Sequence, residues 1–503
     1  METDMKYLVS LLVLFTVAAS AQELPSADSY AVNFDRNAVR TNTGRKLTAI
    51  ALSGNTLTIP NPMCMYVDFT PQLFTAQPGQ TLMPSVAFTG AWMQTYIYID
   101  LNQNGRFDVQ EPGPQGQLGA DNELVSFAGM GLADGNYNSA GQNLADLSDV
   151  QPPAFTLPAN ISPGFYMMRW KIDWNDCDPG GRVDEQNSII KNGGVIVDVL
   201  LRVTDEATEG YQLIFADEFD LPNGSRPDPE KWRSSTRSGS TWNRWISDAE
   251  EVAFLQDGNL VCRAIPNPDT STDNVPMLTG AIETRGLFSF TYGKVEVRLQ
   301  VDPYTGSFPA AWMMPQPPCE VWPNSGEIDI FESVDAQNTA FHTIHSHWSY
   351  DLGHKNDPKS SFSENVNIAQ WHIYGVEWLE NILIFTVDGN VVGTYARSND
   401  EDILAQGQWP FTHPFYLILN QSVGNGSWAK NPDTSHTYET RFDYIRVYQK
   451  SSVDDAVRDM PLQPIIQHQN TAAYYDLLGR PFSATARLRP GIYIRDGKKI
   501  VIN

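Results

Sequence analysis

One acidic stretch in the middle of the chain sets the expected structure around it: Ser325-Gly326-Glu327-Ile328-Asp329-Ile330-Phe331-Glu332. Three carboxylates lie within six residues, and the residues between them are apolar strand formers. A solvated acidic run would not hold Ile328, Ile330 and Phe331 between its charges. The stretch therefore predicts a half-buried β-strand with a row of acids on one face. An acidic strand edge that only faces solvent is the alternative interpretation.

The spacing of the acids predicts an irregularity in this strand. Alternate side chains of a strand share a face, so Glu327 and Asp329 point the same way. Glu332 follows Glu327 by five residues and would face the core of a regular strand. One β-bulge between Asp329 and Glu332 would return Glu332 to the acidic face, and bulges are common beside active sites. Two glutamates near one sugar, with an aspartate between them, form a carboxylate pair of the kind that glycoside hydrolysis requires.

The chain around this stretch is expected to be an all-β domain over residues 211–449. Short strand-like runs alternate there with turn residues, and helical periodicity is nearly absent. Asp388-Gly389-Asn390 predicts a hairpin turn. The expected strands are Tyr292–Gln300, Glu327–Glu332, His372–Trp378, Ile382–Val387, Phe415–Asn420 and Phe442–Tyr448.

A second β domain, sandwich-like, is expected at residues 22–205. Gly, Asn, Asp and Pro separate its short apolar runs, as in a sandwich. A polar linker at 206–210 would follow this domain. The expected strands include Val86–Phe88, Tyr96–Ile99, Phe165–Met168 and Val195–Val199.

Oxygen-bearing side chains line a loop in this N-terminal domain. They are Asp100, Asn102, Asn104, Asp108 and Glu111, at loop positions 1, 3, 5, 9 and 12, with Gly105 at position 6. This order matches a calcium loop, in which the glycine permits a tight turn and the oxygens face a hard cation. The preceding run is strand-like, so the loop is not part of a helix–loop–helix pair. An Asn- and Gly-rich turn without metal is the alternative.

The run from Tyr98 to Asp108 also resembles the GEVED-type accessory domain of secreted bacterial proteins. The later segment Gly193–Asp198 lacks the acidic signature of that family. The resemblance implies a carbohydrate-binding or spacer role for the N-terminal domain.

The first residues read as a secretory signal over 1–21. Lys6 supplies a positive start, Tyr7 to Ala18 is apolar, and Ala19-Ser20-Ala21 is a small-residue cleavage site. The mature protein is therefore expected to be secreted, periplasmic or on the cell surface. An exported chain permits disulfides, and its four cysteines allow one pair in each half.

The overall charge limits the partners. A formal net charge of −25 disfavours nucleic acid and anionic membrane surfaces, because both attract fields of Lys and Arg. Beyond the signal, no run is apolar for long enough to span a membrane. A monomer is expected.

The last part, residues 450–503, is expected to be a linker and a small β module. The segments Tyr474–Arg480 and Leu488–Ile502 resemble the C-terminal sorting domains of secreted Bacteroidetes proteins. That resemblance implies export by a dedicated outer-membrane system or attachment to the surface. A short β appendage without a sorting role is the alternative.

Several ordered motifs surround the acidic stretch. They are Phe215–Asp220, Tyr292–Arg298, Phe308–Met313, Trp322–Glu332, Trp371–Trp378, Pro414–Asn420 and Asp443–Tyr448. Together they make nearly all of residues 211–448 resemble glycoside hydrolase family 16, in its laminarinase-like group. The resemblance implies a β-jelly-roll sandwich with a sugar-binding cleft on its concave sheet. It also implies endo-hydrolysis of a β-linked polysaccharide with retention at the anomeric carbon and without a cofactor.

The family's roles transfer onto the three acids. The resemblance implies that Glu327 is the nucleophile and Glu332 the general acid/base, with Asp329 hydrogen-bonding one or both. A carboxylic acid that stays protonated near neutrality needs a raised pKa, and a neighbouring carboxylate raises it.

Other candidates for sugar contacts lie near the acids or in segments that depart from the family pattern. The family's usual W-G-N-n-E is Trp242-Asn243-Arg244-Trp245 here, and its later G-G-n-W is Gly424-Asn425-Gly426-Ser427-Trp428. The candidates are Trp322, His345, Trp348, Trp242, Asn243, Arg244 and Trp428, and each has packing as its alternative role. His347 is expected to share the strand face of His345 by alternation, and a metal between these two histidines would need a third ligand.

The expected substrate is a β-1,3- or β-1,3-1,4-glucan. An endo-β-galactosidase that acts on mucin-type O-glycans or algal galactans is the alternative, because both departing segments lie where substrate choice is made. A non-catalytic glycan-binding surface protein is the alternative of another class, although a lectin would not need the full set of acids.

Overall fold

The computed structural model describes residues 24–450, except 39, 146–149, 185–187, 205–209 and 320, and the backbone of four short strands after residue 473. Residues 1–451 and 452–503 form two separate compact units. The predicted signal at 1–21 and all of the predicted linker except Gly210 lie outside the described residues.

The N-terminal part of the first unit contains two main sheets. A three-stranded sheet has the order β2-β1-β5, and a six-stranded sheet has the order β3-β11-β10-β6-β7-β8. An apolar core that draws on both sheets lies between them, so this part is a β-sandwich, and all four expected strands are confirmed. Its strands are β1 (Lys46–Leu52), β2 (Asn55–Thr58), β3 (Tyr66–Ala76), β4 (Thr81–Leu82), β5 (Pro84–Thr89), β6 (Gln94–Ile99), β7 (Leu124–Leu132), β8 (Gly135–Asn138), β9 (Phe155–Thr156), β10 (Gly164–Asp173) and β11 (Val195–Val203).

Buried charges lie on the other face of the six-stranded sheet. Arg169 of β10 forms an ion pair with Asp198 of β11 at 2.7 Å, and both side chains are at most 1% exposed. The same guanidinium donates to the backbone carbonyls of Tyr30 and Ala31. Lys171 donates to the carbonyl of Asp176 at 2.6 Å. These cations therefore tie the segments that cover the sheet to its strands.

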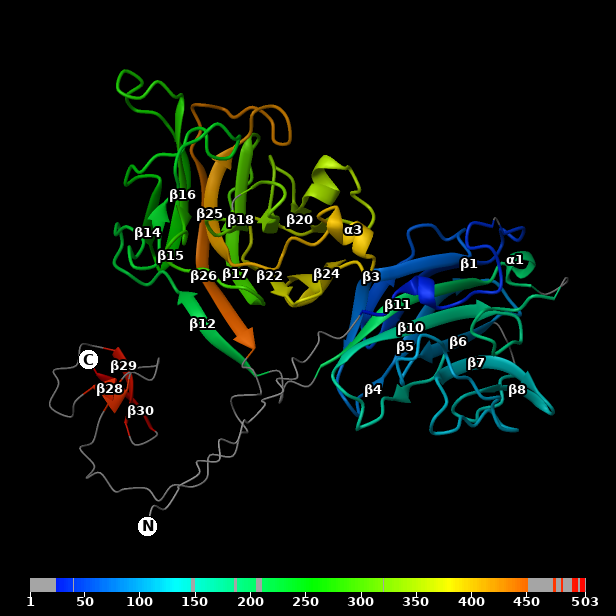
Figure 1. Ribbon diagram of the computed structural model, residues 1–503. Helices are drawn as coiled ribbons and strands as arrows, with labels where there is room; N and C mark the ends of the chain where they lie inside the picture. The colour runs from blue at the N-terminus through cyan, green and yellow to red at the C-terminus, as the bar shows by residue number, and fades with distance from the viewer. Residues whose placement is uncertain are drawn as a thin grey trace, which may run out of the picture. The chain divides into compact units, whose positions relative to one another are not determined.

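The rest of the first unit is a second sandwich built on one long path of strands. The path runs β21-β20-β19-β18-β25-β16-β15-β26-β17-β22-β23-β24, and β12, β13 and β14 pair beside it. Figure 1 shows β16, β25 and β18 side by side, in agreement with their pairing. The strands are β12 (Tyr211–Asp217), β13 (Arg233–Ser234), β14 (Ala253–Gln256), β15 (Asn259–Pro266), β16 (Met277–Glu283), β17 (Gly293–Val301), β18 (Ser307–Pro315), β19 (Glu327–Glu332), β20 (Thr339–His345), β21 (Ser361–Asn365), β22 (His372–Trp378), β23 (Ile382–Val387), β24 (Asn390–Ala396), β25 (Phe415–Val423) and β26 (Tyr438–Lys450).

The path folds into two layers around one core. Ile328, Ile330 and Phe331 of β19 belong to the same buried cluster as Val297 of β17 and Trp378 of β22. The apolar residues between the acids are thus the inner face of one layer, as the acidic stretch predicted. The all-β class is confirmed, and the described helices are short: η1 (Ala27–Ser29), α1 (Ile189–Asn192), the π-helical turn η2 (His347–Asp351) and α3 (Glu401–Ala405).

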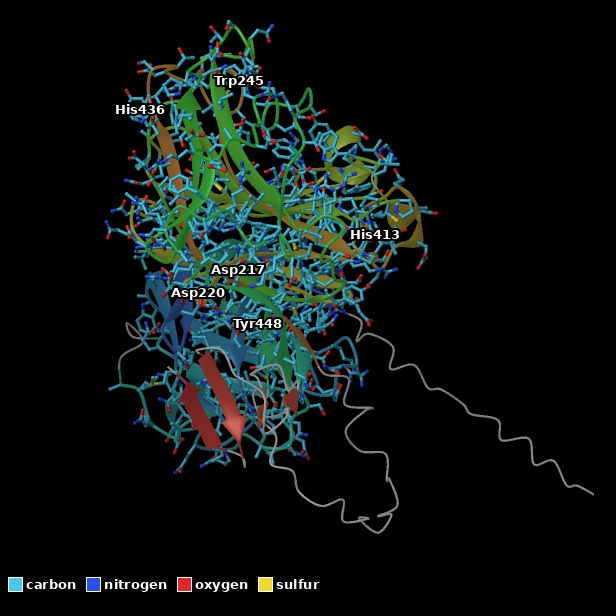
Figure 2. All side chains as sticks on the ribbon, turned by 90° about the vertical axis from the view of Figure 1, so that its left-hand side faces the viewer. Asp217, Asp220, Trp245, His413, His436 and Tyr448 are labelled. Atoms are coloured by element: carbon cyan, nitrogen blue, oxygen red, sulfur yellow. The ribbon has the colours of Figure 1, made fainter. Side chains whose placement is uncertain are left out.

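The first and last strands of this second sandwich lie together. β12 pairs with β26 in antiparallel register, and Figure 2 labels Asp217 and Tyr448 on these two strands. Within the same compact unit, Arg202 of β11 forms an ion pair with Glu377 of β22, which also accepts a hydrogen bond from the hydroxyl of Tyr211. This ion pair connects the two sandwiches.

Neither of the disulfides that the sequence allows is present. All four cysteines are unpaired, and Cys177 and Cys262 are buried. In the second unit, β27 (Tyr474–Tyr475), β28 (Pro481–Phe482), β29 (Gly491–Arg495) and β30 (Lys498–Ile502) form a four-stranded sheet. No helix among the described residues has the length and apolar character needed to cross a bilayer.

Candidate active site

The strand of three acids contains the predicted bulge. On one side β19 pairs with β20, and the register shifts between Asp329 and Glu332. On the other side Phe331 pairs with Ala311 of β18 while Asp329 pairs with Trp312, so Ile330 is the extra residue. The bulge is thereby confirmed, and it turns Ile330 and Phe331 into the core.

Ladder partners define what lies beside the acids. Directly paired residues of antiparallel strands share a face of the sheet. We call the side that carries Glu327, Asp329 and Glu332 the acidic face. The paired residues on this face are His345 beside Glu327, Trp312 and Thr343 beside Asp329, Ala310 and Phe341 beside Glu332, and, one strand further, Ile418 and Asn420.

Two donors converge on Glu327. The indole Nε1–H of Trp322 donates to its Oε2 at 2.5 Å. Asp329 is 2% exposed, and burial, followed by the charges of Glu332 and Glu327 and a hydrogen bond to Glu327, holds its pKa well above the usual range. A protonated Asp329 can donate a hydrogen bond to Glu327, beside the one that Trp322 donates.

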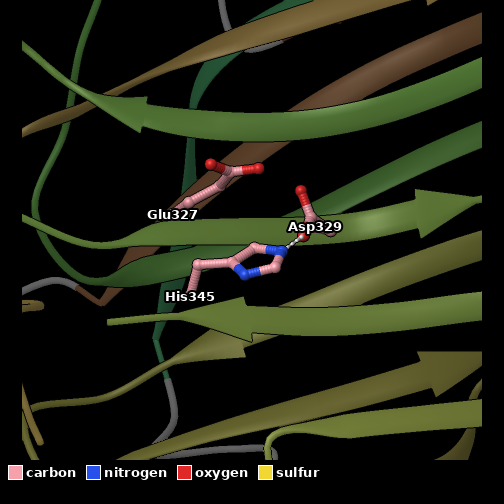
Figure 3. A group of neighbouring side chains, drawn as sticks. All are labelled: Glu327, Asp329 and His345. Carbon is pink, nitrogen blue, oxygen red and sulfur yellow. Dashed lines mark ion pairs between the residues drawn. The ribbon is translucent and has the colours of Figure 1, made fainter. Parts of the chain in front are cut away.

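His345 completes the group around Asp329. Its Nε2 lies 3.4 Å from Oδ2 of Asp329, and Figure 3 shows the ring reaching from β20 toward the acid on β19. Atoms of Glu327, Asp329 and His345 that could hold a metal lie within 4.8 Å of one another. Because Asp329 is held in its protonated form and Glu327 already accepts hydrogen bonds, we interpret this group as an acid–base site.

The carboxyl group of Glu332 holds its proton more tightly than a free glutamate does. Burial, and then the charge of Glu327, raises the pKa of Glu332 to about 8. A glutamate with this pKa is protonated at neutral pH and can serve as a general acid.

Stability should fall as the pH rises from about 4.5 to about 8, and activity should fall as the pH rises through about 8. The general acid loses its proton there, so kcat/KM should show an alkaline limb. The folded state also binds more protons than the unfolded state between the ordinary and the raised pKa, so the melting temperature should decline across this window. A pH–rate profile and melting curves at several pH values measure both effects.

The Glu332→Gln variant serves as the control for this dependence. Its melting temperature should decline less with pH, because glutamine has no proton to lose. An alkaline limb near pH 5, or an unchanged slope in the variant, would contradict the assignment.

Exposed aromatic side chains flank the row of acids. Trp322 is 43% exposed and packs edge-on against Tyr350, which is 50% exposed. Trp428, 51% exposed, packs against Phe341 beside Glu332. Such rings offer flat apolar surface with a polar edge, which suits stacking on sugars.

The two segments that depart from the family pattern contact each other. The guanidinium of Arg244 donates to the carbonyls of Val423 and Gly424, and the amide of Asn425 donates to the hydroxyl of Thr241. Arg244 also lies 4.0 Å from the ring of Trp245, which Figure 2 labels. The guanidinium is therefore used to join the segments, and its candidate role in sugar contact has packing as the better-supported alternative.

Trp242 and Asn243 differ in their surroundings. Trp242 packs edge-on against Trp312 at 4.8 Å between ring centroids, next to the acidic face. Asn243 is 8% exposed, and its side-chain oxygen accepts from the backbone of Ser240. Of the two, Trp242 is placed to meet a sugar, and Asn243 stabilises the turn.

Two expectations for the segment after His345 are wrong. His347 does not share the strand face, because β20 ends at His345 and the side chain of Ser346 caps a π-helical turn that begins at His347. Trp348 is 4% exposed, stacks on His354 and donates to the carbonyl of Asp357. It packs inside its own loop and is not available to a sugar.

Several residues on or beside the acidic face were not predicted from the sequence. Trp312 and Asn420 lie in the family motifs Phe308–Met313 and Pro414–Asn420, and the alternation of faces along those strands was the signal that could have found them. Their side chains are joined by a hydrogen bond of 2.8 Å. Tyr350 had no sequence signal, since it belongs to a turn that the sequence did not predict.

The candidate calcium loop is arranged around Asp100 and Asp108. Asp100 is fully buried and accepts from the hydroxyl of Tyr30 and from two loop amides. Asp108 accepts from the side-chain amides of Asn102 and Asn104.

A further acid, Glu123, lies beside this loop. It is 2% exposed and accepts from the amides of Asn102 and Asp108, and burial, with the nearby acids, raises its pKa. Glu111 instead hydrogen-bonds the thiol of Cys177. Glu123 therefore contacts the backbone of the loop, and calcium binding stays a prediction.

Calcium removal should lower the melting temperature of the N-terminal part by several degrees. A cation that neutralises Asp100, Asp108 and Glu123 would stabilise the folded state by mass action. Melting curves with chelator, and after calcium is restored, measure the effect. Glu123→Gln should weaken the response, while Asp28→Asn, an exposed acid elsewhere, should leave it intact. An unchanged melting temperature under chelator would show that the loop is a plain turn.

Comparison with known proteins agrees with this geometry. The profile described as glycosyl hydrolases family 16 matches residues 249–446, and the GEVED domain profile matches residues 94–195, which confirms both resemblances. A keratan-sulfate endo-1,4-beta-galactosidase of Sphingobacterium multivorum is 36% identical over 251 residues, covering 50% of this chain and 58% of that protein.

Two relatives are named as glucan enzymes. A beta-glucanase of Rhodothermus marinus is 30% identical over 252 residues, which cover 47% of this chain and 85% of that protein. Glucan endo-1,3-beta-glucosidase A1 of Niallia circulans is 29% identical over 269 residues, covering 49% of this chain and 39% of that protein. The chain thus spans less than two thirds of the length of the galactosidase and of the Niallia protein.

A β-sandwich whose sheet carries a bulged row of three acids between exposed tryptophans is the framework of a glycan-processing domain. With these comparisons the family is defined, and the chain belongs to glycosyl hydrolases family 16.

Proposed function

We propose that this protein is an endo-acting β-glycan hydrolase that retains the anomeric configuration. The observation that carries the proposal is the bulge in β19, which puts Glu327, Asp329 and Glu332 in one row on the acidic face. A row of this kind can supply a nucleophile and a separate acid to one sugar.

In the first step, a carboxylate oxygen of Glu327 attacks the anomeric carbon while Glu332 gives its proton to the departing glycosidic oxygen. The carbon–oxygen bond to the leaving sugar breaks, and a glycosyl ester on Glu327 forms. In the second step, Glu332 takes a proton from water, the water oxygen attacks the anomeric carbon, and Glu327 leaves as a carboxylate. Both acids return to their starting states.

The neighbours of the acids support these roles. Trp322 and Asp329 donate hydrogen bonds to Glu327 and so hold its carboxyl group in place for attack. Burial keeps the proton on Glu332, which favours the general acid. Asp329 acts through Glu327 and needs no contact with the anomeric carbon.

For the substrate, we infer a glycan with internal β-galactosidic linkages. The identity of 36% with the keratan-sulfate endo-galactosidase exceeds the 30% with the Rhodothermus beta-glucanase, and it favours galactose over the glucan expected from the sequence. A β-1,3- or β-1,3-1,4-glucan is the second candidate, supported by the two glucan-named relatives.

Product analysis on keratan sulfate, mucin, agarose, laminarin and lichenan separates these candidates. Oligomers ending in galactose support the first, and oligomers ending in glucose support the second. If no polymer is cut, or if Glu327→Gln cuts as well as the wild type, the protein is a non-catalytic glycan binder and the proposal is wrong.

We propose that the other parts of the chain export the enzyme and attach it near its substrate. The segment at 1–21 would direct export, the N-terminal sandwich would bind glycan or act as a spacer, and the four-stranded C-terminal unit would serve sorting or surface attachment. The predicted monomer can be checked by light scattering.

A further inference from the structure

The bulge in β19 leaves two residues opposite one. Asp329 pairs with Thr343 and Glu332 pairs with Phe341, so Ile330 and Phe331 together face His342 of β20. Ile330 also has no ladder partner on β18, where Phe331 pairs with Ala311 and Asp329 with Trp312. The backbone carbonyl of Ile330 therefore lies in the core of the sandwich outside both ladders.

His342 supplies the missing partner. Its side chain is fully buried, and its Nδ1 lies 2.6 Å from the carbonyl oxygen of Ile330. A carbonyl only accepts, so Nδ1 must carry the hydrogen. Among the described residues, Nε2 has no hydrogen-bond partner. Burial lowers the pKa of His342 to about 4, so the ring is neutral in the pH range where the protein is expected to work.

Aromatic rings lie around the side chain of His342. Its ring lies 5.7 Å from that of Phe385 and 6.4 Å from that of Tyr374, measured between centroids. A polar side chain that is buried beside aromatic rings is costly unless it is hydrogen-bonded. Within the described part of the chain, the one side-chain hydrogen bond of His342 goes to the extra residue of the catalytic strand.

We propose that His342 is a positioning residue for catalysis, which holds the Ile330 carbonyl and so fixes the bulge that turns Glu332 onto the acidic face. The inference rests on the proposed function, because Glu332 is taken as the general acid. In a strand without the bulge, Glu332 would point into the core. A loosened bulge would shift the Glu332 carboxyl, and a displacement of about 1 Å can cost about a hundredfold in rate.

Three variants test this role. His342→Leu removes the donor and keeps an apolar side chain. His342→Asn can place an amide N–H where Nδ1 now lies. Ile344→Val trims a buried residue of the same strand and leaves the bulge untouched.

We expect His342→Leu to lower kcat about 10- to 100-fold with KM changed less than about twofold, since the Glu332 carboxyl is displaced but the sugar contacts remain. His342→Asn should recover most of kcat, and Ile344→Val should match the wild type. Wild-type kcat in a folded His342→Leu variant, or equal losses in the Leu and Asn variants, would overturn the proposal.

A second readout needs no substrate. The pKa of Glu332, followed by carbon-13 NMR of its carboxyl group, should move in His342→Leu and stay in His342→Asn. If the wild type cuts no glycan while this pattern holds, the proposed function fails and the positioning role stands. If His342→Leu does not fold, a Glu332 pKa in His342→Asn that differs from the wild type would refute the role, and an unchanged one would support it.

Discussion

Glu327→Gln should abolish glycan hydrolysis, lowering kcat by roughly 10⁴-fold or more, as removal of a nucleophile does in other hydrolases. Glutamine keeps the hydrogen bond from Trp322 but cannot form the glycosyl ester. The measurement is the initial rate on whichever glycan the wild type cuts, together with a melting curve to show that the variant is folded.

The partner variant separates the two acids. Glu332→Gln should also lose activity on a natural glycan, but it should retain much more on an aryl glycoside whose leaving group needs no proton. Added azide should then accelerate turnover of that aryl glycoside, because the glycosyl ester can be attacked without a base. Glu364→Gln changes an exposed acid on β21, which is separated from β19 by β20, and should behave as the wild type. Equal activity of Glu327→Gln and the wild type would remove the nucleophile assignment.

Asp198→Asn should destabilise the N-terminal sandwich by about 3–5 kcal/mol, which is the usual cost of stranding one member of a buried ion pair. Asp198 accepts two bonds from Arg169 at 2.7 Å and one from the hydroxyl of Tyr66 at 2.9 Å. Without the carboxylate, the guanidinium stays charged in a dry interior, where it is held by carbonyls alone.

Urea unfolding followed by fluorescence measures this cost, with separate transitions expected for the two sandwiches. Asp28→Asn removes an exposed ion pair with Arg36 and should cost less than about 1 kcal/mol. The double change Arg169→Met with Asp198→Leu should cost less than the single change, because no charge is left unpaired. A loss below about 1 kcal/mol for Asp198→Asn would mean that water reaches the pair.

Local patterns in the sequence were enough to predict the strands and the bulge. The alternation of acids and apolar residues from Glu327 to Glu332 determines which side chains must be buried, and only a bulge satisfies it. The Asp388-Gly389 turn was also predictable, since both residues take positive φ values of 50° and 79°, as a two-residue hairpin requires.

Contacts between distant segments could not be predicted from the sequence. Alternation placed His347 on a strand, but a cap by Ser346 starts a helical turn there and buries Trp348. The hydrogen bond from His342 to Ile330 depends on the register of two strands, and a lone histidine gives no sign of it. Glu123 likewise reaches the Asp100 loop only through tertiary folding.

The guanidinium of Arg244 holds together two segments that are distant in the sequence and that lie beside the acidic face. Its hydrogen bonds to Val423 and Gly424 span about 180 positions of sequence, and Ser422 adds a bond to the carbonyl of Trp242. A chimera that receives only one of these stretches from a relative would lose the partner groups of the other. Attempts to transplant a new sugar preference into this scaffold should therefore move both stretches as a single cassette.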